Sequence, residues 1–364
     1  MKKVLFPLLV LLLLGLRCVA AAQSLTLSFV GDCTVGEQWC YRGYRSGYTY
    51  KIGQSGLDYP FSLCADLFAA DDLTVANCEG VFTTRLPADR KKAMSLCADP
   101  RFAEVFKLGN VDVVNITNNH ALDFGRQGRL DTIDALTAQG IGYFGESWLY
   151  ETEIKGIKIG IVGHTFHLSE YVLEEYRQQI ETLKADGCSF IIASVHWGRE
   201  DSHELNSEQK AYGTRLIDLG ANMVFGHGSH TLEPIQYYDG GLILYSTGNF
   251  TFGANGKPKD MDTAVIQVMV DSYSDGTVRI SALKAYPYCV CYKADFRPYP
   301  YTEEADRLRV WRKLVFSAKN EPDSCLPASF LTTGYADFGT YYDIATDSDL
   351  ATPTEIAPSG DSHD

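Results

Sequence analysis

The chain has 364 residues and a formal net charge of −14, from 46 acidic and 32 basic residues. It contains no long basic run and no stripe of interleaved aromatic and basic residues, which argues against nucleic acid or an anionic membrane as a partner. An acidic surface also repels polyanions over long distances, so an anionic substrate would need local positive charge or a metal ion.

The N-terminal segment has the pattern of a secretory signal peptide. Lys2 and Lys3 precede an apolar run at residues 4–16, and the alanines at residues 20–22 offer a small-residue cleavage site. A retained anchor is the alternative, although the run is short for a membrane span of about 20 residues. Cleavage after Ala22 would remove three basic residues and no acidic one, so the net charge would move from −14 to −17. We therefore predict an extracytoplasmic protein, secreted or associated with the cell surface.

Export would permit disulfide bonds, but the spacing of the cysteines does not assign them. The chain has 10 cysteines, and removal of Cys18 with the signal peptide leaves an odd number. Leu16 and Arg17 before Cys18 argue against a lipoprotein, because small residues are needed there. The chain has no CxxC pair, which argues against a thiolate zinc site.

Predicted strands and helices alternate over about 230 residues, which is typical of an α/β domain. Apolar runs predict strands at residues 24–30, 73–76, 111–116, 141–144, 189–195 and 223–225. Helical spacing predicts helices at residues 60–70, 100–108, 126–138, 171–184 and 205–219. A hairpin is expected at residues 153–163, around Lys155 and Gly156. Residues 41–59 form a predicted loop whose tyrosines suit either a sugar or peptide groove or a packed loop.

The C-terminal third adds strands at residues 263–270 and 277–292 and a helix at residues 302–316. Residues 346–364 are rich in Asp, Ser and Pro and are predicted to be disordered. The predicted organisation is a signal peptide (1–22), one domain (23–300), a helical extension (301–345) and the disordered tail (346–364).

Residues that can bind a metal follow five of the predicted strands directly. They are Asp32, Glu79, Asn119, His196, His227 and His230. Carboxylates, an amide and imidazoles together suit Mn, Fe or Zn, one ion or two, and not Ca. Each residue alone has an ordinary explanation, such as an Asp that caps a turn or a loop that happens to hold two histidines. Their shared placement at strand ends favours a metal site that activates water for attack.

His120 has a different predicted role from its neighbour Asn119. Successive residues that leave a strand cannot easily aim at one ion, so the amide would bind the metal and the imidazole would face the substrate. Asp123 is a candidate to orient the His120 ring. We predict that His120 and Asp123 act in catalysis.

Four basic residues form a local cluster in an otherwise acidic chain: Arg85, Arg90, Lys91 and Lys92. This loop is either a solvated surface loop or a clamp that attracts an anionic substrate to the metals. Screening leaves only charges within about 8–10 Å effective at physiological salt. We predict that at least one of the four contacts substrate.

Six short motifs in this order resemble the capsule synthesis protein CapA family, which is associated with poly-γ-glutamate capsules. The motifs are Gly31-Asp32, Asn77-x-Glu79, Asn119-His120-Ala121-Leu122-Asp123-x-Gly125, His196-Trp197-Gly198-x-Glu200, Gly226-His227-x-x-His230 and Tyr245-Ser246-x-Gly248-Asn249-Phe250. The resemblance covers roughly residues 25–255. It implies the fold of calcineurin-like metallophosphoesterases, a four-layered α/β/β/α sandwich with its site at the carboxyl ends of the strands.

The resemblance also implies roles for individual residues. Asp32 and His230 would bind a first metal, Glu79 would bridge, and a second metal would be held by Asn119, His196 and His227. Metallophosphoesterases usually begin with Asp-x-His, whereas Thr34 stands at the third position here, so a ligand of the first metal is missing.

Two classes of function are open from the sequence. One is a metal-dependent hydrolase or transferase that acts on a phosphoester or on a γ-glutamyl amide of a cell-surface polymer. The other is a non-catalytic factor that binds or exports the polymer and keeps a vestigial metal site. In both cases we expect an anionic polymer or its precursor as partner, together with capsule-synthesis membrane proteins. His120 favours the enzyme, because a binding module needs no proton donor, and Thr34 favours the binding factor.

Overall fold

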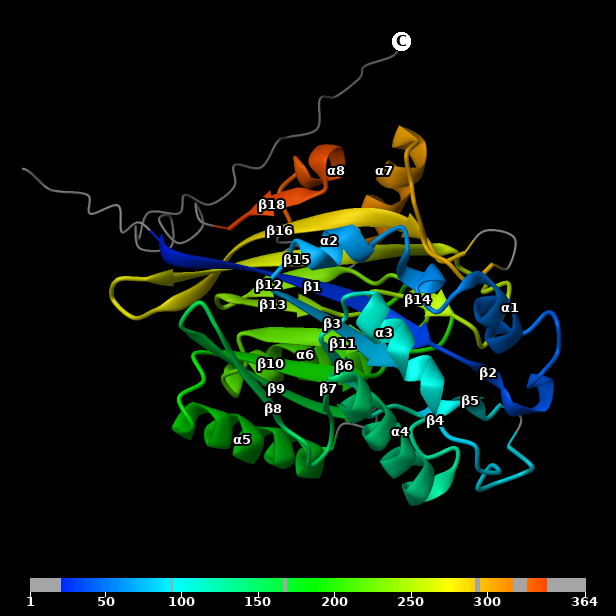
Figure 1. Cartoon of the computed structure of the whole chain (residues 1–364). Helices are drawn as coiled ribbons and strands as arrows, with labels where there is room; N and C mark the ends of the chain where they lie inside the picture. The colour runs from blue at the N-terminus through cyan, green and yellow to red at the C-terminus, as the bar shows by residue number, and fades with distance from the viewer. Residues whose placement is uncertain (1–20, 93, 166–168, 292–294, 317–325, 339–364) are drawn as a thin grey trace, which may run out of the picture.

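The computed structural model describes residues 21–338 apart from residues 93, 166–168, 292–294 and 317–325. The predicted disordered tail lies outside the described residues, as does the predicted signal peptide except for residues 21 and 22. Two large sheets are stacked face to face, and helices lie on their outer sides (Figure 1). None of the described helices combines the length and the apolar character needed to cross a membrane.

The larger sheet is built around the N-terminal strand. Its strand order is β17 (Tyr299–Pro300), β16 (Val278–Cys289), β15 (Asp262–Tyr273), β1 (Ala21–Thr34), β3 (Leu73–Cys78), β6 (Val113–Asn115) and β7 (Gly142–Phe144). β14 (Asn249–Phe252) also pairs with β1, and β18 (Tyr335–Asp337) pairs with β16. β1 is parallel to β3 and antiparallel to β15, so the sheet is mixed.

The second sheet stacks on the first. Its order is β12 (Ile235–Tyr238), β13 (Gly241–Leu244), β11 (Met223–His227), β10 (Phe190–His196), β9 (Ile157–Thr165) and β8 (Tyr150–Ile154). β8 and β9 form the predicted hairpin, which turns at Lys155 and Gly156, both with positive φ. A small third sheet contains β2 (Glu37–Gln38), β5 (Leu96–Ala98) and β4 (Val81–Phe82).

The helices cover the outer faces of the two sheets. On the larger sheet lie α1 (Tyr48–Ser55), α2 (Ala65–Ala69), α3 (Glu104–Leu108) and α4 (Gly125–Gln139); on the second sheet lie α5 (Glu170–Ala185) and α6 (Ser207–Asp218). The C-terminal extension contributes α7 (Glu304–Lys313), α8 (Phe330–Thr333) and the strand β18. Three 3-10 helices span Trp39–Tyr41, Tyr59–Phe61 and Pro100–Ala103.

Three apolar cores hold these layers together. Between the sheets, Leu27 and Phe29 of β1 pack with residues such as Ile192 and Phe225 of the second sheet. A second core lies between the larger sheet and α1 to α4, and a third lies between the second sheet and α5 and α6. The order helix, sheet, sheet, helix is the α/β/β/α sandwich predicted from the sequence.

Several predicted elements differ from those observed. Residues 41–59 are not a loop throughout, because Tyr48 and Ile52 lie one helical turn apart and bury the same face of α1. The helix predicted at residues 60–70 is divided between a 3-10 turn and α2, and the one at 100–108 begins as a 3-10 helix at Pro100. β12, β13, β14 and the small sheet lie outside the elements predicted from the sequence.

One extra residue in β1 controls where Asp32 points. Val30 pairs with Ala76 of β3, yet Asp32 pairs with Asn77, so β1 has a bulge at Gly31. Before the bulge Phe29 faces the second sheet and Val30 faces the helices; after it Cys33 faces the helices. The bulge therefore turns Asp32 toward the second sheet, because side chains alternate along a strand.

The described cysteines are all free thiols, and six of the eight are buried. Cys33 and Cys78 pair across β1 and β3 and pack in the core beneath α1 to α3, away from the second sheet. Burial raises the pKa of the Cys78 thiol to about 12. These two thiols are therefore core residues and point away from Asp32.

The bulge predicts that replacing Gly31 by alanine destabilises the protein. A Cβ atom there would lie 1.7 Å from the carbonyl oxygen of Gly248 and 2.9 Å from Oγ1 of Thr247, so Gly31→Ala requires backbone movement. We expect the free energy of unfolding to fall by more than about 3 kcal/mol. Gly53→Ala is the matched control, because a Cβ atom at that position would have no atom within 4 Å and alanine favours the helix α1. Denaturant titrations that show equal stability for the two variants would contradict this account.

Candidate metal centre

Five of the predicted metal ligands, Asp32, Glu79, His196, His227 and His230, meet where the carboxyl ends of the two large sheets face each other. Asp32 comes from β1 and Glu79 follows β3 directly, while His196 and His227 are the last residues of β10 and β11. His196 and His227 pair with each other across these parallel strands, so both rings lie on one face of the sheet. Asp32 thus lies inside its strand, and not after it as predicted, because β1 continues to Thr34.

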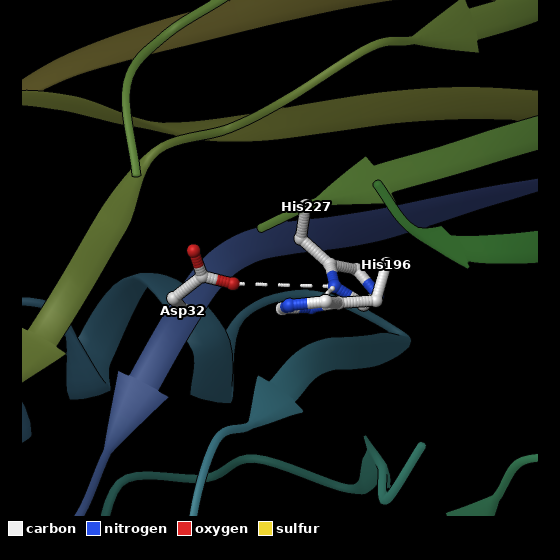
Figure 2. Close-up of side chains that lie close together, drawn as sticks. All are labelled: Asp32, His196 and His227. Atoms are coloured by element: carbon white, nitrogen blue, oxygen red, sulfur yellow. Dashed lines mark hydrogen bonds and ion pairs between the residues drawn. The ribbon is translucent and has the colours of Figure 1, made fainter. Parts of the chain in front are cut away.

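One group of potential ligands contains Asp32, His196 and His227. Figure 2 shows the Asp32 carboxylate on β1 facing the two imidazoles. The Nδ1 atoms of the two histidines are 2.9 Å apart, and Oδ1 of Asp32 lies 4.0 Å from Nδ1 of His227. One ligand atom from each residue lies within 4.8 Å of the others, and all three side chains are buried. This arrangement can bind one metal ion.

A second group contains Asp32, Glu79 and His230. The chain turns after β11 through Gly228 and His230, both with positive φ, and this turn brings the His230 ring back toward β1. Nδ1 of His230 is 3.0 Å from Oδ2 of Asp32, and its Nε2 is 3.9 Å from Oε1 of Glu79. A Cβ at Gly228 would lie 2.8 Å from the His196 ring, so this position requires glycine for space as well as conformation.

Both carboxylates lie between the two sets of imidazoles. Asp32 belongs to both groups, and Oε1 of Glu79 is also 4.0 Å from Nε2 of His196. Either carboxylate is therefore placed to bridge two ions. The predicted bridge was Glu79 alone.

Unpaired oxygens show that the residues present fit a cation. Oε1 of Glu79 and Oδ1 of Asn119 are buried and have no hydrogen-bond partner among the described residues. A buried acceptor without a donor costs free energy, about 1–3 kcal/mol or more for a charged group. A metal ion would satisfy Oε1 of Glu79, which belongs to one of these groups, and Mn, Fe and Zn accept this mixture of oxygen and nitrogen ligands. A metal contact of Asn119 stays a prediction.

Thr34 occupies the position at which metallophosphoesterases usually have a histidine ligand. Its hydroxyl lies 3.5 Å from Oε2 of Glu79, at the edge of the group that contains His230. That group therefore has two carboxylates and one imidazole, and a hydroxyl in place of a second imidazole.

Burial shifts the pKa values of the cluster in opposite directions. Burial lowers the pKa of His227 to about 3 and holds that of His196 well below its usual value, so both rings are neutral at pH 7. Burial raises the pKa of Glu79 to about 7. Burial would also lower the pKa of His230, but the charge of Glu79 and the hydrogen bond with Asp32 raise it to about 10. Burial alone would raise the pKa of Asp32, but the hydrogen bond with His230 and the charge of that ring, with contributions from His196 and Asn77, together lower it.

His120 lies at the edge of the cluster, close enough for its charge to affect Glu79 and His196. Its Nδ1 is 2.8 Å from Oδ2 of Asp123, which is fully buried. Because a carboxylate accepts, Nδ1 carries the proton and Nε2 is the ring nitrogen left for a substrate. The predicted pairing of His120 with Asp123 is therefore present.

The four residues of the basic loop have different surroundings. Arg85 forms an ion pair with Asp131 of α4 at 2.8 Å, and Arg90 and Lys91 are exposed. Lys92 forms an ion pair with Asp123 and thus reaches the site. A substrate contact of this loop stays a prediction.

A set of buried asparagines, for which no role was predicted, holds Asp32 in place by hydrogen bonds. Nδ2 of Asn77 donates to Oδ1 of Asp32 at 2.8 Å. Oδ1 of Asn77 in turn accepts from Asn115 at 2.8 Å and from Asn118 at 3.1 Å. These amides join the ends of β1, β3 and β6. The signal available in the sequence was an asparagine at or just beyond the end of an apolar strand, which needs a polar partner when buried.

A groove of about 750 Å³ opens beside the cluster. His230 and Asn249 line it next to the ligands, and Nδ1 of His230 is 2.9 Å from Oδ1 of Asn249. Further along, the lining includes Glu200, Tyr41, Lys51 and Lys257. A substrate in this groove would reach the cluster from the side of His230.

The pKa values predict how pH affects metal binding. Before an ion binds, His230 is protonated at pH 7 and Glu79 is protonated in about half of the molecules. An ion at the group of Asp32, Glu79 and His230 must displace these protons, so we expect release of more than one proton at pH 7 and an affinity that rises with pH from 6 to 8. Calorimetry in buffers of different ionisation enthalpy measures this release. An affinity that does not change with pH would contradict the assignment of these ligands.

Comparison with known proteins places the chain in a family. Residues 26–254 match the family described as bacterial capsule synthesis protein PGA_cap. The chain is 28% identical over 282 residues to the PGA biosynthesis protein CapA of Bacillus subtilis (strain 168), with 71% of each protein covered. It is 23% identical over 320 residues to the capsule biosynthesis protein CapA of Bacillus anthracis, covering 80% of this chain and 73% of that protein.

Among solved structures, the crystal structure of a hypothetical protein from Thermus thermophilus aligns with a TM-score of 0.46 at 16% identity, covering 72% of this chain and 99% of that one. The family match spans well over half of the chain, and it includes all six proposed metal ligands as well as His120 and Asp123. The chain belongs to the bacterial capsule synthesis protein PGA_cap family.

Proposed function

We propose that the chain is a secreted, metal-dependent hydrolase or transferase that acts on capsular poly-γ-glutamate or a related cell-surface polymer. The observation that carries the proposal is the pair of ligand groups sharing Asp32, in which Oε1 of Glu79 is buried and accepts no hydrogen bond from the described residues. The names of the two Bacillus relatives, which concern PGA or capsule biosynthesis, support the choice of polymer.

The chain's own residues can be assigned to the steps of such a reaction. Asp32, His196 and His227 would hold one ion, and Asp32, Glu79 and His230 a second. When bound, such ions act as Lewis acids and stabilise developing negative charge. The groove beside His230 would bind the polymer chain.

His120 would supply the proton that the leaving group needs. Asp123 accepts from Nδ1 and fixes the plane of the ring, so Nε2 is the nitrogen that carries a second proton. The imidazolium form would give this Nε2 proton to the leaving group and return to the neutral ring with Nδ1 still protonated. A leaving amine or alkoxide requires a proton when its bond to carbon or phosphorus breaks. This role is the same for amide and phosphoester cleavage.

The second candidate function is a non-catalytic factor that binds or exports the polymer. Thr34 favours it, because the group around Glu79 lacks the second imidazole expected from metallophosphoesterases. In this case, the cluster would serve binding alone. For both functions we propose an extracytoplasmic location, capsule-synthesis membrane proteins as partners, and no role for nucleic acid.

Metal analysis and a substrate screen together test the proposal. The purified full chain would be loaded with Mn²⁺, Fe²⁺ or Zn²⁺ and assayed with γ-glutamyl oligomers and with phosphoesters. The matched control is His196→Ala combined with His227→Ala, which removes two ligands. Metal-dependent turnover that the control lacks is the expected result. Polymer binding by both proteins without any turnover would support the non-catalytic factor.

Replacement of His120 separates proton transfer from metal binding. We expect His120→Ala to lower kcat by roughly 10²–10⁴, the range for loss of general acid–base catalysis. Its metal content should equal that of the wild type, because Nδ1 bonds Asp123 and the ring lies outside both ligand groups. Elemental analysis and initial rates check this pair of outcomes. Metal loss in the variant would show that His120 is a ligand.

A further inference from the structure

The basic loop reaches the site through a single side chain, Lys92. Arg85 is held by Asp131 on α4, away from the ligand groups. The ammonium group of Lys92 contacts the Asp123 carboxylate and also lies 3.1 Å from the backbone carbonyl oxygen of Asn119. One cation therefore joins both ends of the turn that runs from Asn119 to Asp123.

Asp123 is the centre of this turn's contacts. Its side chain is fully buried, and Oδ2 accepts from Nδ1 of His120 at 2.8 Å and from the backbone N–H of Leu96 at 2.7 Å. Lys92 binds the other oxygen, Oδ1. The backbone carbonyl of Asp123 accepts from the N–H of Ala88 at 2.8 Å. The loop and the turn are thus joined at both the backbone and the side chains.

The contact with Asn119 has a separate consequence. Oδ1 of Asn119 is one of the buried oxygens without a partner, and the direction of this oxygen depends on the backbone of the same residue. Lys92 binds that backbone carbonyl. Removal of the ammonium group would free the backbone of Asn119 and, at the same time, Asp123, the partner of His120.

We propose that Lys92 is a positioning residue, which fixes the turn from Asn119 to Asp123 so that the Asn119 amide points at the metal and the His120 ring at the substrate. This inference rests on the proposed function for its catalytic part. It replaces a direct substrate contact of Lys92, because the ammonium group is already bound by a carboxylate and a carbonyl. Outer contacts of this kind typically contribute a factor of about 10–100 in metal affinity or activity.

The test compares Lys92→Ala, Lys92→Arg and a matched control in the full-length chain. The control is Lys155→Ala, because Lys155 also joins an aspartate and a backbone carbonyl, Asp72 at 2.8 Å and Ser24 at 3.2 Å, at the start of β1 and β3. Mn²⁺ affinity is measured by calorimetry, and kcat and KM are measured on whichever polymer substrate is turned over. Thermal unfolding of each variant checks that it folds.

We expect Lys92→Ala to lose about 10–100-fold in Mn²⁺ affinity or in kcat, with KM changed less than about two-fold. Lys92→Arg, which keeps the charge and the donors, should recover most of the loss, and Lys155→Ala should behave as the wild type. If Lys92→Ala does not fold, Lys92→Arg is compared with Lys92→Gln instead. The glutamine variant is then expected to show the loss of Mn²⁺ affinity or of kcat.

Two results would overturn the proposal. Equal Mn²⁺ affinity and equal kcat in Lys92→Ala and Lys155→Ala would show that Lys92 is an ordinary surface residue. A rise in KM that depends on ionic strength, with kcat unchanged, would show that it contacts the substrate. If the wild type binds Mn²⁺ but turns over no substrate, the catalytic function fails, and Mn²⁺ affinity alone decides the role of Lys92.

Discussion

The position of Asp32 depends on a single extra residue in a buried strand, the bulge at Gly31. Without it, Asp32 would face the helices beside Val30, in an apolar core where a charge has no partner. With it, the carboxylate faces the second sheet, where β10 and β11 both end in histidine. The close contact of Gly31 with the carbonyl of Gly248 shows that the bulge also sets the distance between β1 and β14. The two ligand groups exist because this one carboxylate is shared between them.

A buried cluster of this kind requires a polar scaffold, and the strand ends provide it. Asn77 donates to Asp32 and accepts from Asn115 and Asn118, so the amide that supports the charge is itself fixed by two others. On the other sheet, Nε2 of His227 lies 2.9 Å from the Ser194 hydroxyl, which leaves Nδ1 toward Asp32. These contacts orient the ligands before any ion binds. Among the described residues, Oε1 of Glu79 and Oδ1 of Asn119 are two of the buried side-chain atoms without a hydrogen-bond partner, and Oδ1 of Asn115 in this scaffold is another.

Strand patterning predicted an α/β chain, and the family resemblance implied the order of its four layers. In parallel sheets the strands are apolar on both faces, so a polar residue that follows an apolar run marks the sheet's carboxyl edge. This rule placed His196 and His227 at strand ends, where the structure has them. It found Asp32 for an incomplete reason, because periodicity alone cannot show a bulge. It missed α1, whose only apolar repeat is Tyr48 and Ile52, and it did not predict the salt bridge between Lys92 and Asp123, because that contact depends on how a loop folds back.

Charge balance connects the cluster to the acidic character of the whole chain. Asp32 and Glu79 contribute two negative charges when ionised, and neutral imidazoles and an amide contribute none. One divalent ion would make the cluster neutral, whereas two would leave it with two positive charges. A chain with a net charge of −14 would then hold a positive centre beside a groove lined by three lysines, Lys51, Lys257 and Lys259, and by three acidic residues, Glu37, Glu200 and Asp201. An anionic polymer would be repelled by most of the surface and attracted there, since charges beyond about 8–10 Å are screened at physiological salt. The number of ions bound therefore decides whether this centre can attract such a polymer by charge.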